Sequence, residues 1–502
     1  MPNRPIAAQP VQVLPGIYLQ SPAGRWTLAG AVLSSGAVFL ESTVVNVALP
    51  VLGRDLGLGL EGLQWVLNSY LLTLSALMLL GGSLGDLLGH RRMLCIGLTG
   101  FTITSLTAAF APSAVVLIGV RIVQGVAGAM LVPNTLALIN SRFAPGDRAQ
   151  AIGRWAGWSA VSTALGPLVG GALVDALSWR WVFGVPAPFA LAALGIIARR
   201  VAPDPGVRRP HRQVDTVGAG LVTLGLAGVI WALIAAPARG LGDPVVAVLG
   251  SSGLALLAAF LAYERRARDP MLPLSLFAAP QFTGANAVTL LVYAALGGMM
   301  FLLPLQLQNG LGYSALQAGA AMLPINVLML TLSGRAGRLA QRRGPAMPLG
   351  VGALLCAVGM GLLARIQPGM SYLGGVLPGI LVFGLGLALL VAPLTAAVLG
   401  AVREEQGGIA SAVNNAAARV AGLFAVAALP LAAGIGRASA APGAALGPGY
   451  ARAMGIAAAL CVAGAAVAVA TARRASPRAP TVHPNLFYGC VEPPAADSGA
   501  RA

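Results

Sequence analysis

The sequence predicts an all-α integral membrane protein with about fourteen membrane-spanning helices. Three observations support this fold class: the composition, the succession of long apolar segments, and the positions of the arginines. Of the 502 residues, 57% are hydrophobic and only 9% are charged, and the mean hydropathy is +0.81. A soluble chain of this length needs many more polar side chains to cover its surface. We therefore exclude a soluble protein.

Apolar segments long enough to cross a bilayer follow one another along the chain. A hydrocarbon core of about 30 Å takes roughly 17–25 residues of helix. By that measure we predict spans at residues 26–49, 63–80, 93–110, 115–138, 155–177 and 182–197, then 217–234 and 245–263, and finally 285–305, 315–332, 347–363, 373–399, 409–431 and 453–470. Glycine and proline inside these segments fit membrane helices, where both are more frequent than in soluble ones.

The basic residues, all of them arginine, test this count independently. If the N-terminus is cytoplasmic, the inside loops carry clusters such as Arg91 and Arg92, and the outside loops carry isolated residues such as Arg54 and Arg239. This is the positive-inside bias of membrane proteins. Both termini are therefore expected in the cytoplasm. The net charge of +17 then reflects topology, and we expect no nucleic-acid partner.

The spans divide the chain into five parts. We expect a cytoplasmic arm at residues 1–25, a six-helix bundle at 26–200, a linker with two extra membrane helices at 201–282, a second six-helix bundle at 283–472, and a disordered cytoplasmic tail at 473–502. The loop GSLGDLLGHRR at residues 82–92 follows the second span, and a shorter echo, GRLAQRRG at 337–344, follows the second span of the second bundle. Two copies at matching places predict a duplicated six-helix unit.

Side chains that perform enzymatic chemistry are few and scattered. The four cysteines form no CxxC pair and the three histidines are isolated from one another, so we expect no metal site, no cofactor and no enzyme. A GxxxxGK[ST] phosphate-binding loop is absent from the sequence, which disfavours transport driven by ATP.

Two ionisable residues fall well inside predicted spans. Glu41 has apolar residues on both sides, and a charge at the centre of a membrane helix costs roughly 2.5–3.5 kcal/mol. Desolvation favours its protonated form, so Glu41 can bind and release a proton. Arg121 forms a stripe on one helical face with Gln124, Gly125 and Gly128. A cation near Glu41 opposes protonation, so we assign proton coupling to Glu41 and Arg121. The alternative is a static ion pair.

Other polar and small residues of the spans are candidates for a cavity or a moving surface. For the substrate cavity we select Asn46, Gln64, Asn68, Gln124 and Asn134. The close spacing of Gly166, Pro167, Gly170 and Gly171 predicts tight helix packing on a face that slides. Asp215 is expected to cap a helix. Asp175, near a helix end, is either a second protonation site or an interfacial acid.

These motifs together resemble those of the major facilitator superfamily, and within it the fourteen-helix drug:proton antiporters. The stretch 82–92 is similar to the superfamily's loop signature, in which Asp86 matches the gating aspartate. The segments LESTVVNVALP (40–50) and LIGVRIVQGVAGA (117–129) are similar to the first- and fourth-helix signatures, with Arg121 on the arginine of the latter. GPLVGG (166–171) is similar to the fifth-helix signature of exporters. The gating-loop residues implied are Gly82, Asp86, Gly89, Arg91 and Arg92.

Three positions depart from the family pattern. Glu41 stands where aspartate is usual, Gln341 replaces an acid in the second loop copy, and Arg419 is shifted by one position from the usual arginine. The longer Glu41 is still a carboxylate, so a proton-linked role remains open to it. The role of Arg419 stays unassigned.

The resemblance implies two pseudo-symmetric bundles plus two extra central helices, with the substrate between the bundles near the bilayer midplane. It implies a monomeric, proton-coupled antiporter of the cytoplasmic membrane that exports drugs, antibiotics or similar amphipathic molecules by alternating access. The proton gradient is then the energy source, with no cofactor. A dedicated exporter or importer of one endogenous metabolite on the same fold is the alternative. A receptor or scaffold has no need of a buried Glu41 and Arg121.

Overall fold

The computed structural model describes residues 16–204, 214–267, 270–403, 406–435 and 446–472. Within these ranges all regular secondary structure is helical, apart from an isolated bridge between Ile17 and Phe143. Fourteen of its helical segments are long and apolar enough to cross a membrane. The predicted all-α membrane architecture is confirmed.

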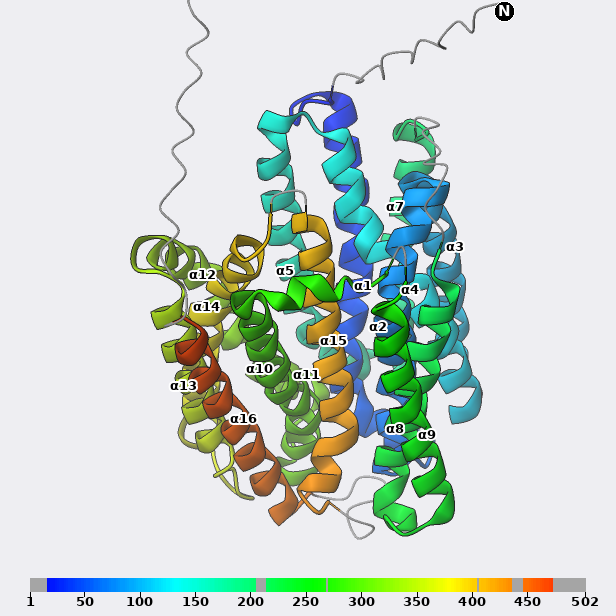
Figure 1. The fold of residues 1–502 in the computed structure, drawn as a ribbon. Coiled ribbons are helices and arrows are strands. Elements are labelled where there is room, and N and C mark those ends of the chain that lie inside the picture. The colour runs from blue at the N-terminus through cyan, green and yellow to red at the C-terminus, as the bar shows by residue number, and fades with distance from the viewer. Residues whose placement is uncertain (1–15, 205–213, 268–269, 404–405, 436–445, 473–502) are drawn as a thin grey trace, which may run out of the picture.

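The first six spans form one bundle (Figure 1). The sixth is broken at Val185, because the proline that follows has no backbone N–H to continue the helical bonding. The elements are α1 (Pro22–Asp55), α2 (Leu60–Leu88), α3 (His90–Ala109), α4 (Ala114–Arg142), α5 (Pro145–Ala176), α6 (Arg180–Gly184) and α7 (Pro186–Arg200). Helix α5 begins well before its predicted span, because the polar turns at its start are also helical.

The remaining spans form a two-helix hairpin and a second bundle. The hairpin consists of α8 (Thr216–Arg239) and α9 (Pro244–Glu264). Asp215 caps α8 as predicted, since its carboxylate accepts a hydrogen bond of 2.7 Å from the Gly218 N–H. The second bundle comprises η1 (Leu274–Ala278), α10 (Pro280–Leu305), η2 (Gln306–Gly310), α11 (Ala315–Ala321), α12 (Leu323–Arg343), α13 (Ala346–Leu363), η3 (Tyr372–Val376), α14 (Leu377–Gly400), α15 (Gly407–Ala432) and α16 (Pro448–Ala472).

The two bundles repeat the same packing scheme. Helix α1 packs against α5 and α7 as α10 packs against α15 and α16, and α2 packs against α4 as α12 packs against α14. Likewise α3 packs against α4 and α7, as α13 packs against α14 and α16. Gly89 (φ 97°) and Gly344 (φ 81°) close α2 and α12 at matching places in a conformation that other residues adopt at a cost. This recurrence confirms the pseudo-symmetric duplication.

The α8–α9 hairpin lies beside both bundles. Helices α8 and α9 pack closely on each other, and α8 also contacts α2 of the first bundle and α15 of the second. The two green helices stand to the right of α15 in Figure 1. The close approach within the hairpin depends on Gly228, where an added Cβ would lie 2.7 Å from the Leu249 carbonyl oxygen.

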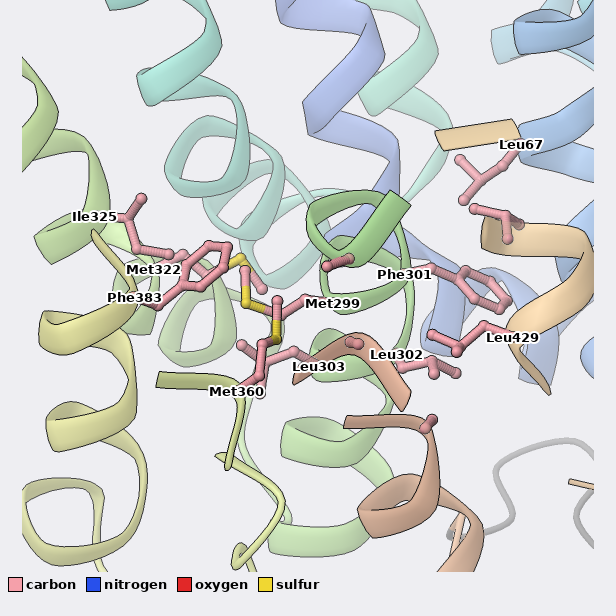
Figure 2. Close-up of a cluster of buried hydrophobic side chains, with 14 of the residues drawn as sticks. Leu67, Met299, Phe301, Leu302, Leu303, Met322, Ile325, Met360, Phe383 and Leu429 are labelled. Carbon is pink, nitrogen blue, oxygen red and sulfur yellow. The ribbon is translucent and has the colours of Figure 1, made fainter. Parts of the chain in front are cut away.

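A continuous apolar core joins the two bundles. It contains Leu67 of α2 together with Phe301 of α10 and Leu429 of α15, all at most 5% exposed. Figure 2 shows these three on one side of the cluster, with Met299, Met360 and Phe383 filling the interior of the second bundle. We name the end of the molecule at which α1 begins and α16 ends the termini side, and the opposite end the far side.

Candidate functional site: a buried ion pair and its connections

The centre of the first bundle holds an ion pair that is out of contact with solvent and with the bilayer. The Arg121 guanidinium of α4 donates through Nη1 to Oε1 of Glu41 on α1. The exposed fractions of the two side chains are 1% and 0%. Removing two charges from water is costly, and a buried pair persists only where further hydrogen bonds support it. The structure thus brings together the two residues to which proton coupling was assigned.

Arg121 has several further partners besides Glu41. They come from three helices: Oε1 of Gln124 (α4) at 2.9 Å, the Val66 carbonyl (α2) at 3.2 Å, and the rings of Tyr70 (α2) and Phe183 (α6), whose centroids lie 4.2 and 5.6 Å from Cζ. Gln124 in turn donates to Ser105 (α3) at 2.9 Å. These contacts fix the guanidinium and reduce the cost of its burial through hydrogen bonds and aromatic faces.

Only one of the two carboxylate oxygens of Glu41 has a hydrogen-bond partner in the described structure. Its Oε2 atom has no hydrogen-bond partner in the described structure, and the same holds for polar atoms of Asn68, Ser69 and Tyr70 on α2. Buried polar groups without partners are rare in folded proteins and costly. The free oxygen can take a proton without disturbing the bond from Arg121 to Oε1. Chemically, Glu41 is therefore the member of the pair that can change protonation state.

The glycine stripe of α4 holds α2 close to the ion pair. A Cβ added at Gly125 would lie 2.5 Å from the Tyr70 carbonyl oxygen, and one at Gly128 would lie 3.2 Å from Cδ1 of Leu74. Larger residues at either position would push α2 away. The stripe thereby keeps the Tyr70 ring over Arg121.

One face of the GPLVGG segment of α5 packs on α1 next to Glu41. A Cβ at Gly170 would lie 2.6 Å from the Val44 carbonyl oxygen, and one at Gly166 would collide with the Thr43 hydroxyl. Thr43 also donates to the Thr163 carbonyl at 3.2 Å. The two helices therefore move as one unit unless this contact breaks.

The opposite face of GPLVGG packs across the molecule on α11 of the second bundle. A Cβ at Gly171 would lie 2.5 Å from the Ala315 carbonyl oxygen and 2.6 Å from Cα of Leu316. A Cβ at Gly319 would in turn collide with the Pro167 carbonyl. The same short segment therefore contacts α1 within its own bundle and α11 in the other.

Asp175 at the end of α5 closes the far side. Its carboxylate accepts hydrogen bonds from the Ser314 hydroxyl at 2.6 Å and from the Ala315 and Leu316 N–H groups at 3.1 and 2.9 Å. It thus caps α11 from the other bundle. Of the two sequence-based hypotheses for Asp175, this geometry matches the interfacial acid.

Three further hydrogen bonds join the two bundles. They join Gln64 to the Val426 carbonyl (2.6 Å), Gln308 to the Val47 carbonyl (2.8 Å) and Asn326 to the Ala164 carbonyl (3.2 Å). Among the described residues, none lies nearer the termini side than the Asn326–Ala164 bond. In the described part of the chain, the hydrogen bonds between the bundles therefore extend from the middle of the molecule to the far side, and none lies at the termini side.

The gating loop is tied to the first bundle. Asp86 lies 3.6 Å from Nε2 of His90, whose Nδ1 is 2.8 Å from Oδ1 of Asn134. The Arg91 N–H donates to Asp204 at 2.9 Å, and its guanidinium donates to the Ala198 carbonyl at 2.7 Å. Gly82 lies against Pro133 and Arg92 is exposed. The loop thus binds α4 and the end of α7 to the junction of α2 and α3.

The five residues selected for a cavity differ in their hydrogen-bond partners. Gln124 belongs to the Arg121 network, Gln64 bonds to α15, and Asn134 bonds to the gating loop and to the Gly81 carbonyl at 2.9 Å. Asn46 bonds to the Ser42 carbonyl of its own helix at 3.3 Å. Asn68 is fully buried with neither amide atom bonded. Sequence reasoning missed Ser105, a polar residue inside a span, and Phe183, which no sequence signal distinguishes.

Asp175→Ala is expected to loosen the far side. Loss of a helix cap costs about 0.5–2 kcal/mol. Because Asp175 caps a helix of the other bundle, only the arrangement in which the far side is closed, as described here, loses this stabilisation. Spin labels on exposed Leu177 and Leu373, at the far-side ends of the two bundles, should show a broader and longer distance distribution. Asp243→Ala is the matched control, since Asp243 caps α9 within the hairpin. Identical distributions in wild type and Asp175→Ala would contradict the assignment.

Comparison with known proteins places this arrangement in a family. The sequence profile of the Major Facilitator Superfamily matches residues 31–426. A puromycin resistance protein of Streptomyces alboniger is 38% identical over 433 residues, covering 84% of each chain. A tetracenomycin C resistance and export protein of Streptomyces glaucescens is 33% identical, covering 80% of this chain and 74% of its own. A cephamycin export protein of Amycolatopsis lactamdurans is 36% identical, covering 80% and 83%.

Solved structures show the same fold. An inward-facing, unoccupied bacterial homologue of the human lysosomal transporter Spinster superposes with a TM-score of 0.66 at 15% identity, covering 90% of this chain and 98% of that one. The POT family transporter PepTSo superposes with a TM-score of 0.61 at 14% identity, covering 89% of this chain and 98% of that one. With fourteen apolar helices, duplicated bundles and a family match along most of its length, the chain belongs to the Major Facilitator Superfamily and is a multi-pass membrane transporter, not an enzyme.

Proposed function

We propose that the protein is a proton-coupled antiporter that exports amphipathic small molecules, antibiotics among them, across the cell membrane. The observation that carries the proposal is the buried Glu41–Arg121 pair, in which one carboxylate oxygen is bonded and the other is free. The relatives support the direction of transport, since they are named as resistance and export proteins. The chain acts as a monomer without a cofactor, and the proton gradient supplies the energy.

The termini side faces the cytoplasm in this proposal. Helices α4, α7 and α12 end there with arginines in their last turns, namely Arg142, Arg199, Arg200, Arg342 and Arg343, in keeping with the positive-inside bias. Because the hydrogen bonds between the bundles lie toward the far side, the described conformation is the one that takes up cargo from the cytoplasm.

Protonation of Glu41 is transmitted through α5. A neutral carboxyl loses most of its attraction for Arg121, so α1 is no longer held to α4 by an ion pair. Helix α1 packs on Gly166 and Gly170, and the adjacent residue of α5, Gly171, packs on α11. A shift of α1 therefore reaches the contacts that close the far side. Each proton that enters supplies about 2.3 kcal/mol per 100 mV of membrane potential.

The decisive experiment uses inverted membrane vesicles with an imposed proton gradient. Addition of puromycin, the compound named for one relative, should dissipate the gradient in vesicles that contain the protein and not in vesicles without it. An uncoupler should abolish puromycin uptake. Uptake that proceeds equally well with no ion gradient would overturn the proposal. A resistance panel in an efflux-deficient host then separates a broad exporter from one dedicated to a single metabolite.

A further inference from the structure

We propose that Arg419 on α15 is the receptor for the anionic group of those cargo molecules that carry one, so that an aromatic carboxylate binds more tightly than its neutral analogue. The inference deepens the proposed export function and rests on it. It concerns the second bundle, whereas the proton-coupling pair belongs to the first.

Arg419 is a cation within a span for which the described chain provides no counter-ion. It lies near the middle of α15 and is half-buried. Within the described ranges, no carboxylate lies within 4.0 Å of its guanidinium and no hydrogen bond satisfies it. The ring of Phe39 lies 5.7 Å from Cζ. An intramembrane cation without a partner is costly and indicates a functional site.

Arg121 shows what a fully partnered arginine looks like in the same molecule. It is 1% exposed and bonds to Glu41, Gln124 and the Val66 carbonyl. The remaining described acids of the spans lie at or near helix ends, as Asp55, Asp175 and Glu264 do. The described chain therefore offers Arg419 no internal anion, and a ligand between the bundles can supply one.

The neighbours of Arg419 define the rest of the ligand. Phe39 of α1 is half-buried and presents an aromatic face to the guanidinium. The buried Tyr70 hydroxyl interacts electrostatically with Arg419 and also lies near the Ser42 side chain. A guanidinium binds a carboxylate through two parallel hydrogen bonds, a phenol can donate a third, and Phe39 stacks on an adjacent ring. A cargo held in this way touches both bundles, because Phe39 and Tyr70 belong to the first and Arg419 to the second.

The test compares two probes that differ in one group. Binding of 2-naphthoate, an anion at pH 7, and of 2-naphthamide, its neutral analogue, is measured by equilibrium dialysis on the full chain in nanodiscs, with empty nanodiscs as the blank. Wild type should bind the acid about 10- to 100-fold more tightly, as expected for charge-assisted hydrogen bonds. Equal binding of the two probes by the wild-type protein, or no saturable binding of the acid, is enough to overturn the proposal.

Variants test whether Arg419 is responsible for the preference for 2-naphthoate over 2-naphthamide. Arg419→Gln should abolish the preference while leaving the weaker binding of 2-naphthamide, which also reports that the variant is folded. Arg419→Lys should retain part of the preference, since it keeps the charge but not the planar fork. Arg403→Gln, an identical change at an exposed position, should bind as wild type. A preference that persists in Arg419→Gln overturns the assignment.

Failure of this inference and failure of the proposed function give different results. If vesicles show proton-driven export but the two probes bind equally, the export function stands and Arg419 is not an anion receptor. If the acid is preferred but transport is independent of a proton gradient, the anion site stands and proton coupling falls.

Discussion

Glu41→Gln is expected to abolish proton-driven export while leaving the helical fold in the membrane. Glutamine has the size and the charge of a protonated glutamate, and its carbonyl oxygen can still accept the bond from Arg121. It cannot release a proton, so the pair can no longer pass between charged and neutral states. Arg121 keeps Gln124, the Val66 carbonyl and the Tyr70 ring as partners, which limits the loss of stability.

Glu61→Gln is the matched control for this substitution. Glu61 is an exposed acid in the first turn of α2, so the same chemical change is made where no ion pair is present. Puromycin-induced dissipation of the proton gradient should fall to the level of protein-free vesicles in Glu41→Gln and stay at the wild-type level in Glu61→Gln. Equal elution of the two purified variants as monodisperse protein excludes misfolding. Full drug resistance in cells that carry Glu41→Gln would refute the coupling role of Glu41.

The fold could be predicted because it depends on quantities that a sequence displays directly. Each span is a run of apolar residues as long as the bilayer is thick, and the loop echo at 337–344 marks the duplication. Glu41 and Arg121 stood out for the same reason, since a charge inside an apolar run is rarely tolerated without a partner. Sequence position alone could not show that Arg121 bonds to only one of the two Glu41 oxygens. The orientation of Arg121 depends on Phe183, Tyr70 and Gln124, which belong to three different helices.

The cavity residues and the far-side closure could not be predicted in this way. Asn134 and Asn68 look alike in the sequence, as single amides in apolar runs, but Asn134 bonds to His90 whereas Asn68 has no partner. Asp175 finds its partners 139–141 positions along the chain, in the other bundle. Such contacts depend on how the two bundles meet, and no local pattern encodes that arrangement.

Gly171→Val tests whether the exporter segment of α5 controls the far side. A side chain at Gly171 would enter the space occupied by the Ala315 carbonyl and Cα of Leu316. These are backbone atoms of α11, so they cannot rotate away, and overpacking costs about 1–3 kcal/mol. Only the arrangement with a closed far side bears this cost. Its population relative to the open arrangement should therefore fall roughly 5- to 150-fold.

Gly157→Val provides the control on the same helix, since a Cβ at Gly157 meets nothing within 4 Å. In Gly171→Val the distance between spin labels on Leu177 and Leu373 should lengthen. Export should fall in proportion to the lost closed population, because under the proposed function cargo enters from the cytoplasm only in that arrangement. Gly157→Val should leave both measurements unchanged. Normal export by Gly171→Val with an unaltered label distance would mean that α5 and α11 can separate or repack freely. The path from Glu41 through α5 to the far side would then have to be abandoned.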